Sequence, residues 1–320
     1  MNKKINVGII GRNFGYKVIY RALKNIKDFK VLGFSVKKIS NKFTSEKIKI
    51  YKNWKSLISD KKIDAIFISS PPFTHRKIIE FAIKKKKHIF CDKPVSTNIK
   101  NITMLCKKLQ NKKLVNFVNY EFGHIEAFKI FKIKYLPKIK VKNININWTI
   151  KIPQKCRSKW KDDHEKGGGN FFNYICHILF YLEDFFGKID VYESKLNNLK
   201  NKFELKTKLL SKDKKIKIRL NFKTINKKSN LRPNHKIIFN TNKGKFVLVT
   251  KINNIYDQFY LLKNKRVIFK PKNINFDFRL KPTLKNIISF KNSINKNIKA
   301  KPNFNDAKKI HYLIKKIINY

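Results

Sequence analysis

Long apolar runs are absent from this sequence: no stretch of about 18 residues is apolar enough to cross a bilayer. A core strand is predicted from residue 5 onward, which leaves no room for a signal peptide in front of it. We therefore expect a soluble, cytoplasmic protein that does not bind membranes. The 320 residues exceed the usual size of one domain, so we expect two domains with a large buried core.

Cysteine is scarce, with four residues in the whole chain. None of them forms a CxxC pair or has the Cys/His spacing that is typical of metal ligands, so neither disulfides nor a metal site is predicted. We interpret them as buried or incidental thiols: Cys91, Cys106, Cys156 and Cys176.

Acidic residues and arginine are few beside lysine. The chain has 76 Lys and Arg against 20 Asp and Glu, a formal net charge of +56, and only 8 of its basic residues are arginine. Such a charge by itself is typical of nucleic-acid-binding proteins. The lysines, however, are spread evenly among Asn, Ile and Phe, whose codons are AT-rich, whereas nucleic-acid readers favour clustered arginine. We attribute the charge to drift in an AT-rich genome and expect no specific nucleic-acid partner, although charge alone keeps that alternative open.

Residues 1–120 alternate short apolar runs with amphipathic stretches. Strands that are apolar on both faces and alternate with helices indicate a parallel sheet covered on both sides. We therefore predict a doubly wound α/β domain. Its predicted strands lie at residues 5–10, 29–36, 62–70, 87–94 and 113–120, with helices such as 74–87 between them.

Residues 121–320 instead carry polar side chains at every second position of longer runs. One apolar face per strand indicates an open, mostly antiparallel sheet, so we predict an α+β domain with a hairpin turn at 242–244. Asn305 or Asp306 is expected to cap the last helix, and the last helices are free to pack back on the first domain. The clearest strands are predicted at 138–150, 215–224, 235–250 and 264–270, and the helices at 167–187, 282–297 and 302–319.

The first strand runs into a glycine turn, "GRNFG". A dinucleotide fingerprint needs one glycine for the sharp turn, a second for approach of the diphosphate and a third for helix packing. Gly11 and Gly15 supply two of these, and Asn13 takes the middle place, where asparagine best tolerates a left-handed backbone after glycine. The motif alone is weak, because similar turns occur in α/β folds that bind no nucleotide. Its candidate cofactor-binding residues are Gly11, Arg12, Asn13, Phe14 and Gly15.

Two later segments fall at the carboxyl ends of predicted strands: "ISSPPFTHRKIIEFAIKKKKHIFCDKPVS" and "EKGGGNFFNYICHILFYLEDFFG". With the glycine turn they resemble the Gfo/Idh/MocA family, the relatives of glucose-fructose oxidoreductase and inositol dehydrogenase. That family has a proline-rich loop before a His-bearing helix, a strand ending in Glu-Lys-Pro, and a triple glycine before a helix with Asp and His four apart. The matching residues here are Pro71, Pro72 and His75, then Asp92, Lys93 and Pro94, then Gly167, Gly168, Gly169, Asn173 and His177.

The resemblance implies a Rossmann fold and a nicotinamide-dependent oxidoreductase in which Lys93 transfers the proton. A lysine that follows an apolar strand and precedes a proline lies where α/β sheets place their ligands, although most lysines of such a chain are merely solvated. The resemblance also implies a cofactor site that includes Ser70, Pro71, Pro72, His75, Asp92 and Lys93.

Asn173 and His177 are the remaining catalytic candidates and, with Lys93 and Tyr120, the substrate-binding ones. Residues four apart share one face of a helix, although satisfied polar residues beside an apolar helix are an alternative interpretation. Asn173 stands where the family has Asp, and an amide can hydrogen-bond but cannot act as a base, so acid/base chemistry falls on Lys93 and His177.

Other departures from the family alter the expected pocket. Ile175 replaces a common Gly and Phe180 a common Asp, which predicts a more apolar substrate pocket, and Asp92 shortens the usual Glu by one methylene. Gly123 or His124 replaces an Arg of the family. Trp160 and Lys161 stand where the family has Trp-Arg near the cofactor or substrate, although Trp160 is equally expected to be a core residue. No metal is expected.

The end of the second strand predicts the cofactor. Ser35, Lys37 and Lys38 occupy the place of the acid that binds the ribose hydroxyls of NAD, and no acid precedes Glu46. Lysines attract a 2′-phosphate, so NADP(H) is expected in preference to NAD(H).

The sequence therefore predicts a hydride-transferring enzyme that acts on a secondary alcohol or ketone of a sugar, sugar nucleotide or polyol. By analogy, it would make a surface-glycan sugar. A catalytically degenerate, nucleotide-binding regulatory or scaffold protein is the alternative, motivated by Asn13, Asn173 and Phe180 and opposed by Lys93 and His177. An open sheet leaves a face to cover, so a homodimer or homotetramer is expected.

Overall fold

The computed structural model describes residues 4–36, 48–151, 159–199, 202–226, 229–250, 258–272 and 277–320. The chain forms two compact units. Unit 1 consists of residues 1–121, 163–172 and 279–309, and unit 2 of residues 122–162, 173–278 and 310–320. A boundary between independently folding domains after residue 120 stays a prediction. Lys37, Lys38 and Cys156 lie outside the described residues.

Unit 1 is built on sheet A, six parallel strands in the order β3-β2-β1-β4-β5-β6. The chain moves outward from β1 to β3 and then returns to the other side of β1, so the strand order reverses between β1 and β4. In such sheets, ligands bind at the carboxyl ends of the strands beside this reversal. The predicted doubly wound fold is confirmed. The strands are β1 (Ile5–Ile10), β2 (Phe29–Ser35), β3 (Lys49–Ile50), β4 (Ala65–Ile68), β5 (His88–Asp92) and β6 (Asn116–Asn119).

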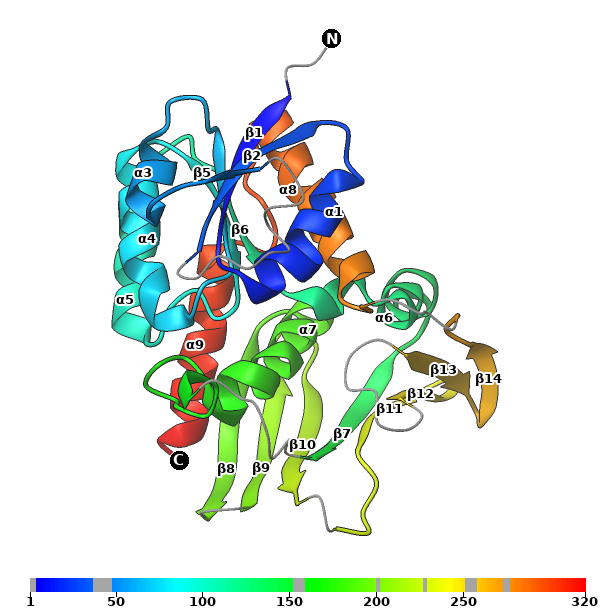
Figure 1. Ribbon diagram of the computed structural model, residues 1–320. Coiled ribbons are helices and arrows are strands. Elements are labelled where there is room, and N and C mark those ends of the chain that lie inside the picture. The colour runs from blue at the N-terminus through cyan, green and yellow to red at the C-terminus, as the bar shows by residue number, and fades with distance from the viewer. Residues whose placement is uncertain are drawn as a thin grey trace. The chain divides into compact units, whose positions relative to one another are not determined.

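Helices cover both faces of sheet A. One face carries α1, the wide helical turn η1 before it and α8, while α3, α4 and α5 cover the other (Figure 1). Helix α8 comes from the C-terminal part of the chain, so unit 1 is completed by a segment distant in sequence. The helical elements are η1 (Gly15–Tyr20), α1 (Arg21–Lys24), α3 (Trp54–Ser59), α4 (Pro72–Lys84), α5 (Ile99–Leu109), α8 (Leu280–Asn295) and the first residues of α9 (Phe304–Ile318).

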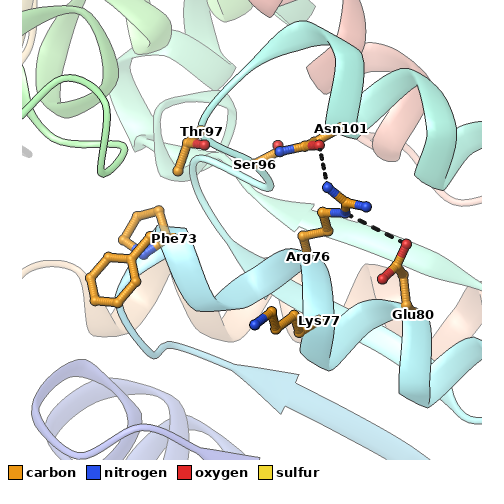
Figure 2. A pocket seen from close by; sticks show the side chains of 8 residues that line it. Phe73, Arg76, Lys77, Glu80, Ser96, Thr97 and Asn101 are labelled. Atoms are coloured by element: carbon orange, nitrogen blue, oxygen red, sulfur yellow. Dashed lines mark hydrogen bonds and ion pairs between the residues drawn. The ribbon is translucent and has the colours of Figure 1, made fainter.

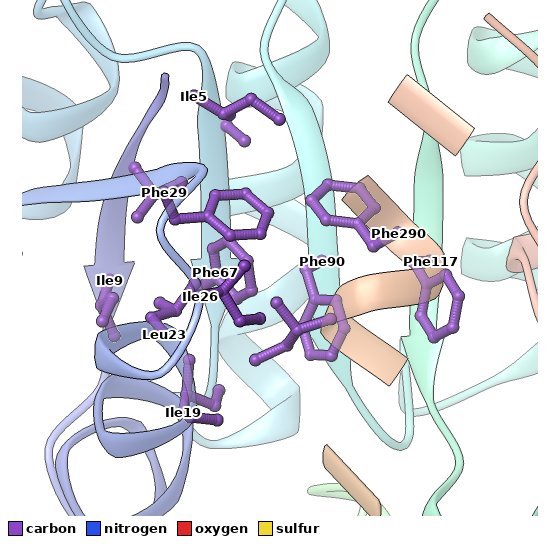
Figure 3. Packing of buried hydrophobic residues seen from close by; sticks show 14 of the residues in the cluster. Ile5, Ile9, Ile19, Leu23, Ile26, Phe29, Phe67, Phe90, Phe117 and Phe290 are labelled. Carbon is purple, nitrogen blue, oxygen red and sulfur yellow. The ribbon is translucent and has the colours of Figure 1, made fainter. Parts of the chain in front are cut away.

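A row of phenylalanines fixes α8 on sheet A (Figure 3). Phe67 stacks on Phe90 with ring centroids 4.8 Å apart, and Phe90 stacks on Phe117 at 5.4 Å. Phe290 of α8 meets all three rings at 5.7 to 6.2 Å and at steep angles. Burial of each ring contributes roughly 1.5–3 kcal/mol, and each favourable ring pair about 0.5–1.5 kcal/mol more. These contacts fix α8 on the face of sheet A.

Unit 2 is built on sheet B, eight strands in the order β14-β13-β12-β11-β7-β10-β9-β8. Within the described part of the sheet, β7 and β10 pair in parallel and every other neighbouring pair is antiparallel. The predicted open, mostly antiparallel sheet is confirmed. Its strands are β7 (Val141–Lys151), β8 (Ile189–Leu199), β9 (Lys202–Ser211), β10 (Ile216–Ile225), β11 (Asn234–Thr241), β12 (Gly244–Thr250), β13 (Phe259–Lys263) and β14 (Arg266–Phe269).

Three of these strands, β8, β9 and β13, were not singled out by the sequence pattern. The register of β8 against β9 shifts between Val191 and Glu193, so the apolar alternation of β8 changes phase within the strand. The helical segments of this part of the chain are η2 (Glu121–His124), α6 (Glu126–Ile130), η3 (Phe131–Tyr135), η4 (Leu136–Lys138), η5 (Lys159–Lys161), η6 (Phe171–Ile175) and α7 (Cys176–Phe186).

Two local predictions have different outcomes. The hairpin turn is confirmed, because Thr241 pairs with Gly244, which has a φ of +97°. The predicted cap of α9 is wrong. Asn303 is the cap: its Oδ1 accepts the N–H groups of Asn305 at 2.8 Å and of Asp306 at 3.4 Å, and the Asp306 carboxylate accepts the N–H of Asn303 at 2.9 Å. This reciprocal pair is a capping box, and its first residue precedes both residues that were predicted as the cap.

Candidate active site

The turn after β1 is built on two glycines that lie against Ser69, just beyond β4. Gly11 has a φ of +122°, and a Cβ there would lie 2.6 Å from the carbonyl carbon of Ser69. A Cβ on Gly15 would lie 2.7 Å from Ser69 Oγ. The first helix therefore begins in close contact with the neighbouring strand, and the unbonded N–H groups of its first turn lie at the carboxyl edge of the sheet, where they suit an anion.

Asparagine was expected to suit position 13 because it tolerates a left-handed backbone, but Asn13 does not adopt that conformation. It already lies in the helical turn, so no left-handed backbone is required there. Tyr16 N–H donates to the carbonyl of Arg12 at 2.9 Å, which closes the turn. Ser35, at the end of β2, is nearly buried, and its carbonyl accepts the N–H of Gly11 at 3.1 Å. The geometry of the turn thus fits a dinucleotide although its middle glycine is missing.

His75 joins the loops that follow β4 and β5. Its ring is fully buried, with Nε2 at 2.7 Å from the carbonyl oxygen of Ser70 and Nδ1 at 2.9 Å from that of Pro94. Burial lowers the pKa of His75 to about 4, although both carbonyl contacts favour the protonated ring. The neutral ring has a single N–H to donate, and its two nitrogens join the loops that follow β4 and β5.

Lys93 follows β5 directly, and its ammonium donates to the carbonyl of Phe172 at 3.1 Å. Burial raises the pKa of the preceding Asp92, while the charges of Lys93 and Arg279 and a hydrogen bond from Asn119 oppose that rise. The carboxyl end of β5 therefore presents an acid and a lysine side by side, both held by partners.

The triple-glycine segment packs on the two proline loops. Gly167 has a φ of +82°, and a Cβ there would lie 2.5 Å from the Cβ of Pro72 and 3.3 Å from Pro94. With the bond from Lys93 to Phe172, this contact brings the proline loop, the Asp-Lys-Pro turn and the glycine segment together within unit 1.

The candidates His177 and Asn173 belong to unit 2. His177 is fully buried in α7, with its ring 4.7 Å from that of Phe122. Asn173 lies in the wide turn η6 before that helix, so the two residues do not share a regular α-helical face. The Asn173 amide donates to the carbonyl of Lys161 at 2.8 Å and thereby holds the turn that contains Trp160. Tyr120, by contrast, lies in unit 1 and is 2% exposed.

Residues 5–120 match the model of an oxidoreductase family with an NAD-binding Rossmann fold, Gfo/Idh/MocA. The match covers about a third of the chain. The resemblance stated from the motifs is thus confirmed.

Two curated relatives match parts of the chain. An uncharacterised oxidoreductase of Bacillus subtilis, YrbE, is 37% identical over 103 residues, which is 31% of this chain and 30% of the relative. The myo-inositol 2-dehydrogenase of Thermotoga maritima is 30% identical over 84 residues, 26% of this chain and 25% of the relative. The chain thus spans less than a third of each of these relatives.

Solved structures of the same fold match the chain along nearly its full length. An oxidoreductase from Thermotoga maritima has a TM-score of 0.80 at 17% identity, over 99% of this chain and 96% of that one. The 3-ketoreductase KijD10 from Actinomadura kijaniata, solved with NADP and TDP-benzene, has a TM-score of 0.77 at 14% identity, over 99% and 98%. At these identities the likeness shows the fold alone.

Sequence reasoning missed a polar network around Asp92. Asn119 bonds to Asp92, and Asn286 Nδ2 donates to Asn119 Oδ1 at 2.8 Å. Thr283 Oγ1 lies 3.5 Å from Asn119 Nδ2, and both α8 side chains are fully buried. With Arg279 they are spaced i, i+4 and i+7 along α8. Polar residues at that spacing within an otherwise apolar helix face are the signal that would have found them.

A pocket of about 310 Å³ lies between α4 and α5 (Figure 2). Arg76 donates to Asn101 at 2.9 Å, and its Nε lies 3.6 Å from Glu80. Phe73 at its rim is 47% exposed. Because the guanidinium joins the two helices, we assign this pocket no part in the chemistry.

The described residues show neither membrane-crossing nor metal-binding features. None of their helices has both the length and the apolarity to cross a bilayer, and no three His, Cys, Asp or Glu side chains among them gather as metal ligands. Of their cysteines, Cys91 and Cys176 are buried and Cys106 is partly buried. Burial raises the pKa of Cys91, and that of Cys106 to about 11.

Proposed function

We propose that this protein is an NAD(P)-dependent oxidoreductase that moves a hydride between nicotinamide and a secondary alcohol or ketone of a sugar, sugar nucleotide or polyol. The observation that carries the proposal is the position of Lys93. It follows β5 at the carboxyl edge of a Rossmann sheet, and the backbone of the triple-glycine segment holds its ammonium. This is the edge at which such sheets bind their ligands.

The residues at this edge fit a dinucleotide. The absence of side chains at Gly11 and Gly15 lets the turn pack closely on Ser69, and the first N–H groups of the helix suit the diphosphate. Ser35 ends the strand at which the adenosine ribose is expected, and Asp92 offers carboxylate oxygens to ribose hydroxyls. The cofactor supplies the hydride chemistry when it is bound.

The protein itself positions substrate and manages the proton. Lys93 Nζ exchanges a proton with the reacting oxygen, giving it to a forming alkoxide or taking it from a hydroxyl. His177 takes part in this proton transfer or holds the reacting hydroxyl. Asn173 donates and accepts hydrogen bonds but cannot be a base. Tyr120, Trp160 and Lys161 remain proposed neighbours of these ligands.

The names of the relatives support the substrate class. One is a myo-inositol 2-dehydrogenase, a polyol enzyme, and one neighbour in fold is a 3-ketoreductase solved with a thymidine diphosphate derivative. A role in making a surface-glycan sugar is a finer proposal, and so is a cytoplasmic location. We also propose a homodimer or homotetramer, because the outer face of sheet B carries half-exposed apolar side chains such as Ile238 and Val247.

NADP(H) is the expected cofactor. The end of β2 offers the Ser35 hydroxyl instead of an acid, and lysines follow in the sequence at 37 and 38. An acid there would repel a 2′-phosphate, whereas lysines attract it. Fluorescence titration of the purified protein with NADPH and NADH should show tighter binding of NADPH. Equal affinities, or tighter NADH, would contradict the preference, and no binding of either would contradict the proposed function.

One observation favours the alternative, a catalytically degenerate binder: the Asn173 amide already holds the backbone of Lys161. Asn173→Asp distinguishes the two. In an active enzyme, the new charge should leave turnover unchanged or lower it. A carboxylate has no N–H, so it cannot donate to the carbonyl oxygen of Lys161 as the Asn173 amide does. The measurement is steady-state turnover on a panel of sugars and polyols with both cofactors. A wild type that binds cofactor tightly but turns nothing over, with activity gained in Asn173→Asp, would overturn the enzyme assignment.

A further inference from the structure

Helix α8 runs antiparallel to the strands of sheet A. Near its C-terminal end, the Lys291 ammonium lies 3.1 Å from the carboxylate of Asp28, whose carbonyl accepts the N–H of Ile5 at the start of β1. Near its N-terminal end, Thr283 lies beside Asn119 at the end of β6. The helix therefore directs its N-terminus to the carboxyl edge, as the connecting helices of a doubly wound sheet do.

Arg279 stands directly before this helix and lies at the candidate cofactor site. Its guanidinium carbon is 5.2 Å from the ring centre of Phe14, which belongs to the glycine turn. Its charge also acts on Asp92 at the end of β5. The cation thus lies beside the turn after β1, and its charge reaches the end of β5, although Arg279 is more than 260 positions downstream of the turn in sequence.

We propose that Arg279 binds the diphosphate of the dinucleotide. This rests on the proposed function and adds a ligand-binding residue that neither the glycine turn nor the Asp-Lys-Pro motif contains. A diphosphate held by the N–H groups of the first helix turn would have its outward oxygens beside this guanidinium. A planar guanidinium fork donates two parallel hydrogen bonds to phosphate oxygens, which a lysine cannot do.

Arg279 is held where such a role requires it. Its carbonyl accepts the N–H of Thr283 at 3.0 Å, so it is joined to the first turn of α8. Thr283 and Asn286 are fully buried in the network around Asp92, and Phe290 fixes the helix on the phenylalanine row. A pre-positioned guanidinium loses little conformational freedom when it binds an anion.

A purely structural role for Arg279 is the competing explanation, since it contacts Phe14 and acts on Asp92. Ligand fragments separate the two roles. ADP-ribose contains the diphosphate, whereas AMP has the same adenosine and a single phosphate. A residue that binds the diphosphate affects ADP-ribose much more than AMP, and a residue that only supports the fold affects both alike.

The experiment is calorimetric titration of ADP-ribose, AMP and NADPH into the wild type, Arg279→Met and Arg279→Lys. Charge-assisted bonds to phosphate predict that Arg279→Met weakens ADP-ribose and NADPH binding about 10- to 100-fold. AMP affinity should change less than about threefold. Arg279→Lys keeps the charge without the fork and should lie between the two. Arg76→Met is the matched control, because Arg76 joins α4 to α5 on the face of sheet A opposite to α8, and it should bind like the wild type.

The outcomes separate this inference from the proposed function. If the wild type binds none of the dinucleotides, both fail. If the wild type binds them and Arg279→Met binds ADP-ribose as tightly, only the role of Arg279 fails. Equal losses of ADP-ribose and AMP also overturn that role. Thermal unfolding of each variant guards against misfolding: if Arg279→Met does not fold, an Arg279→Lys affinity for ADP-ribose equal to that of the wild type counts against the proposal.

Discussion

Replacing Lys93 with methionine should lower turnover by about 10²- to 10⁴-fold, the usual contribution of a positioned acid or base. Methionine keeps an unbranched side chain of similar length, but it can neither carry a proton nor donate to Phe172 O. The affinity for cofactor should change much less, since the glycine turn is untouched. The measurements are single-turnover hydride transfer and cofactor titration with the same protein preparation.

Two variants control this prediction. Lys93→Arg keeps a charge and a donor but cannot give up a proton, so it should bind substrate without restoring turnover. Lys87 is the matched control, because it stands directly before β5 whereas Lys93 stands directly after it. Its side chain is 8% exposed and donates to the carbonyl of Asp60 at 3.0 Å. Lys87→Met should therefore lower stability and leave turnover near that of the wild type. Full activity in Lys93→Met would refute proton transfer by this lysine.

Loss of the imidazole at His177 should produce a comparable defect, about 10²- to 10⁴-fold in turnover, or about 3–5 kcal/mol of barrier. Because the ring is fully buried against Phe122, His177→Ala also removes packing, which destabilises the protein. His177→Phe keeps an aromatic ring there and removes only the nitrogens. Both variants should lose turnover, whereas His177→Phe should unfold at a temperature nearer that of the wild type.

His235 is the matched control for His177. It is also buried in unit 2, stacks on Trp148 with ring centroids 4.0 Å apart, and burial lowers its pKa to about 3. A neutral, stacked histidine of this kind is a packing residue, so His235→Phe should alter stability but not turnover. If His177→Phe were as active as the wild type, His177 would be a packing residue as well. The same would follow if His177→Phe and His235→Phe lost activity equally.

The sequence by itself determined the two sheets and the strand-end positions of two candidate site residues. Apolar residues in β4 and β5 are buried on both faces and those of β10 on one, and a periodicity of two along a strand is a local property. Gly11 and Lys93 were found for the same reason: a glycine after one strand and a lysine before a proline after another both lie at strand ends. Such signals need only neighbouring residues.

Local signals were weaker where the chain departs from regular geometry. The register shift of β8 hides its alternation, and the wide turn η6 removes Asn173 from the helical face it was expected to share with His177. His75 was predicted as a cofactor-site residue, and only the tertiary structure shows that its ring is buried against two loop carbonyls. Each of these features depends on backbone geometry that departs from the regular periodicity of a helix or a strand.

The tertiary structure alone decided which distant residues complete the edge. Nothing in the local spacing relates Asp92 to Asn119, Asn286 or Arg279, because these contacts form only when α8 packs on the phenylalanine row of sheet A. The free energy that places α8 comes from burial of Phe290 among rings of three different strands, and it is gained only after a long stretch of chain has closed. Sequence periodicity therefore specified the helices and strands, and long-range packing specified which polar side chains they bring to the carboxyl edge of sheet A.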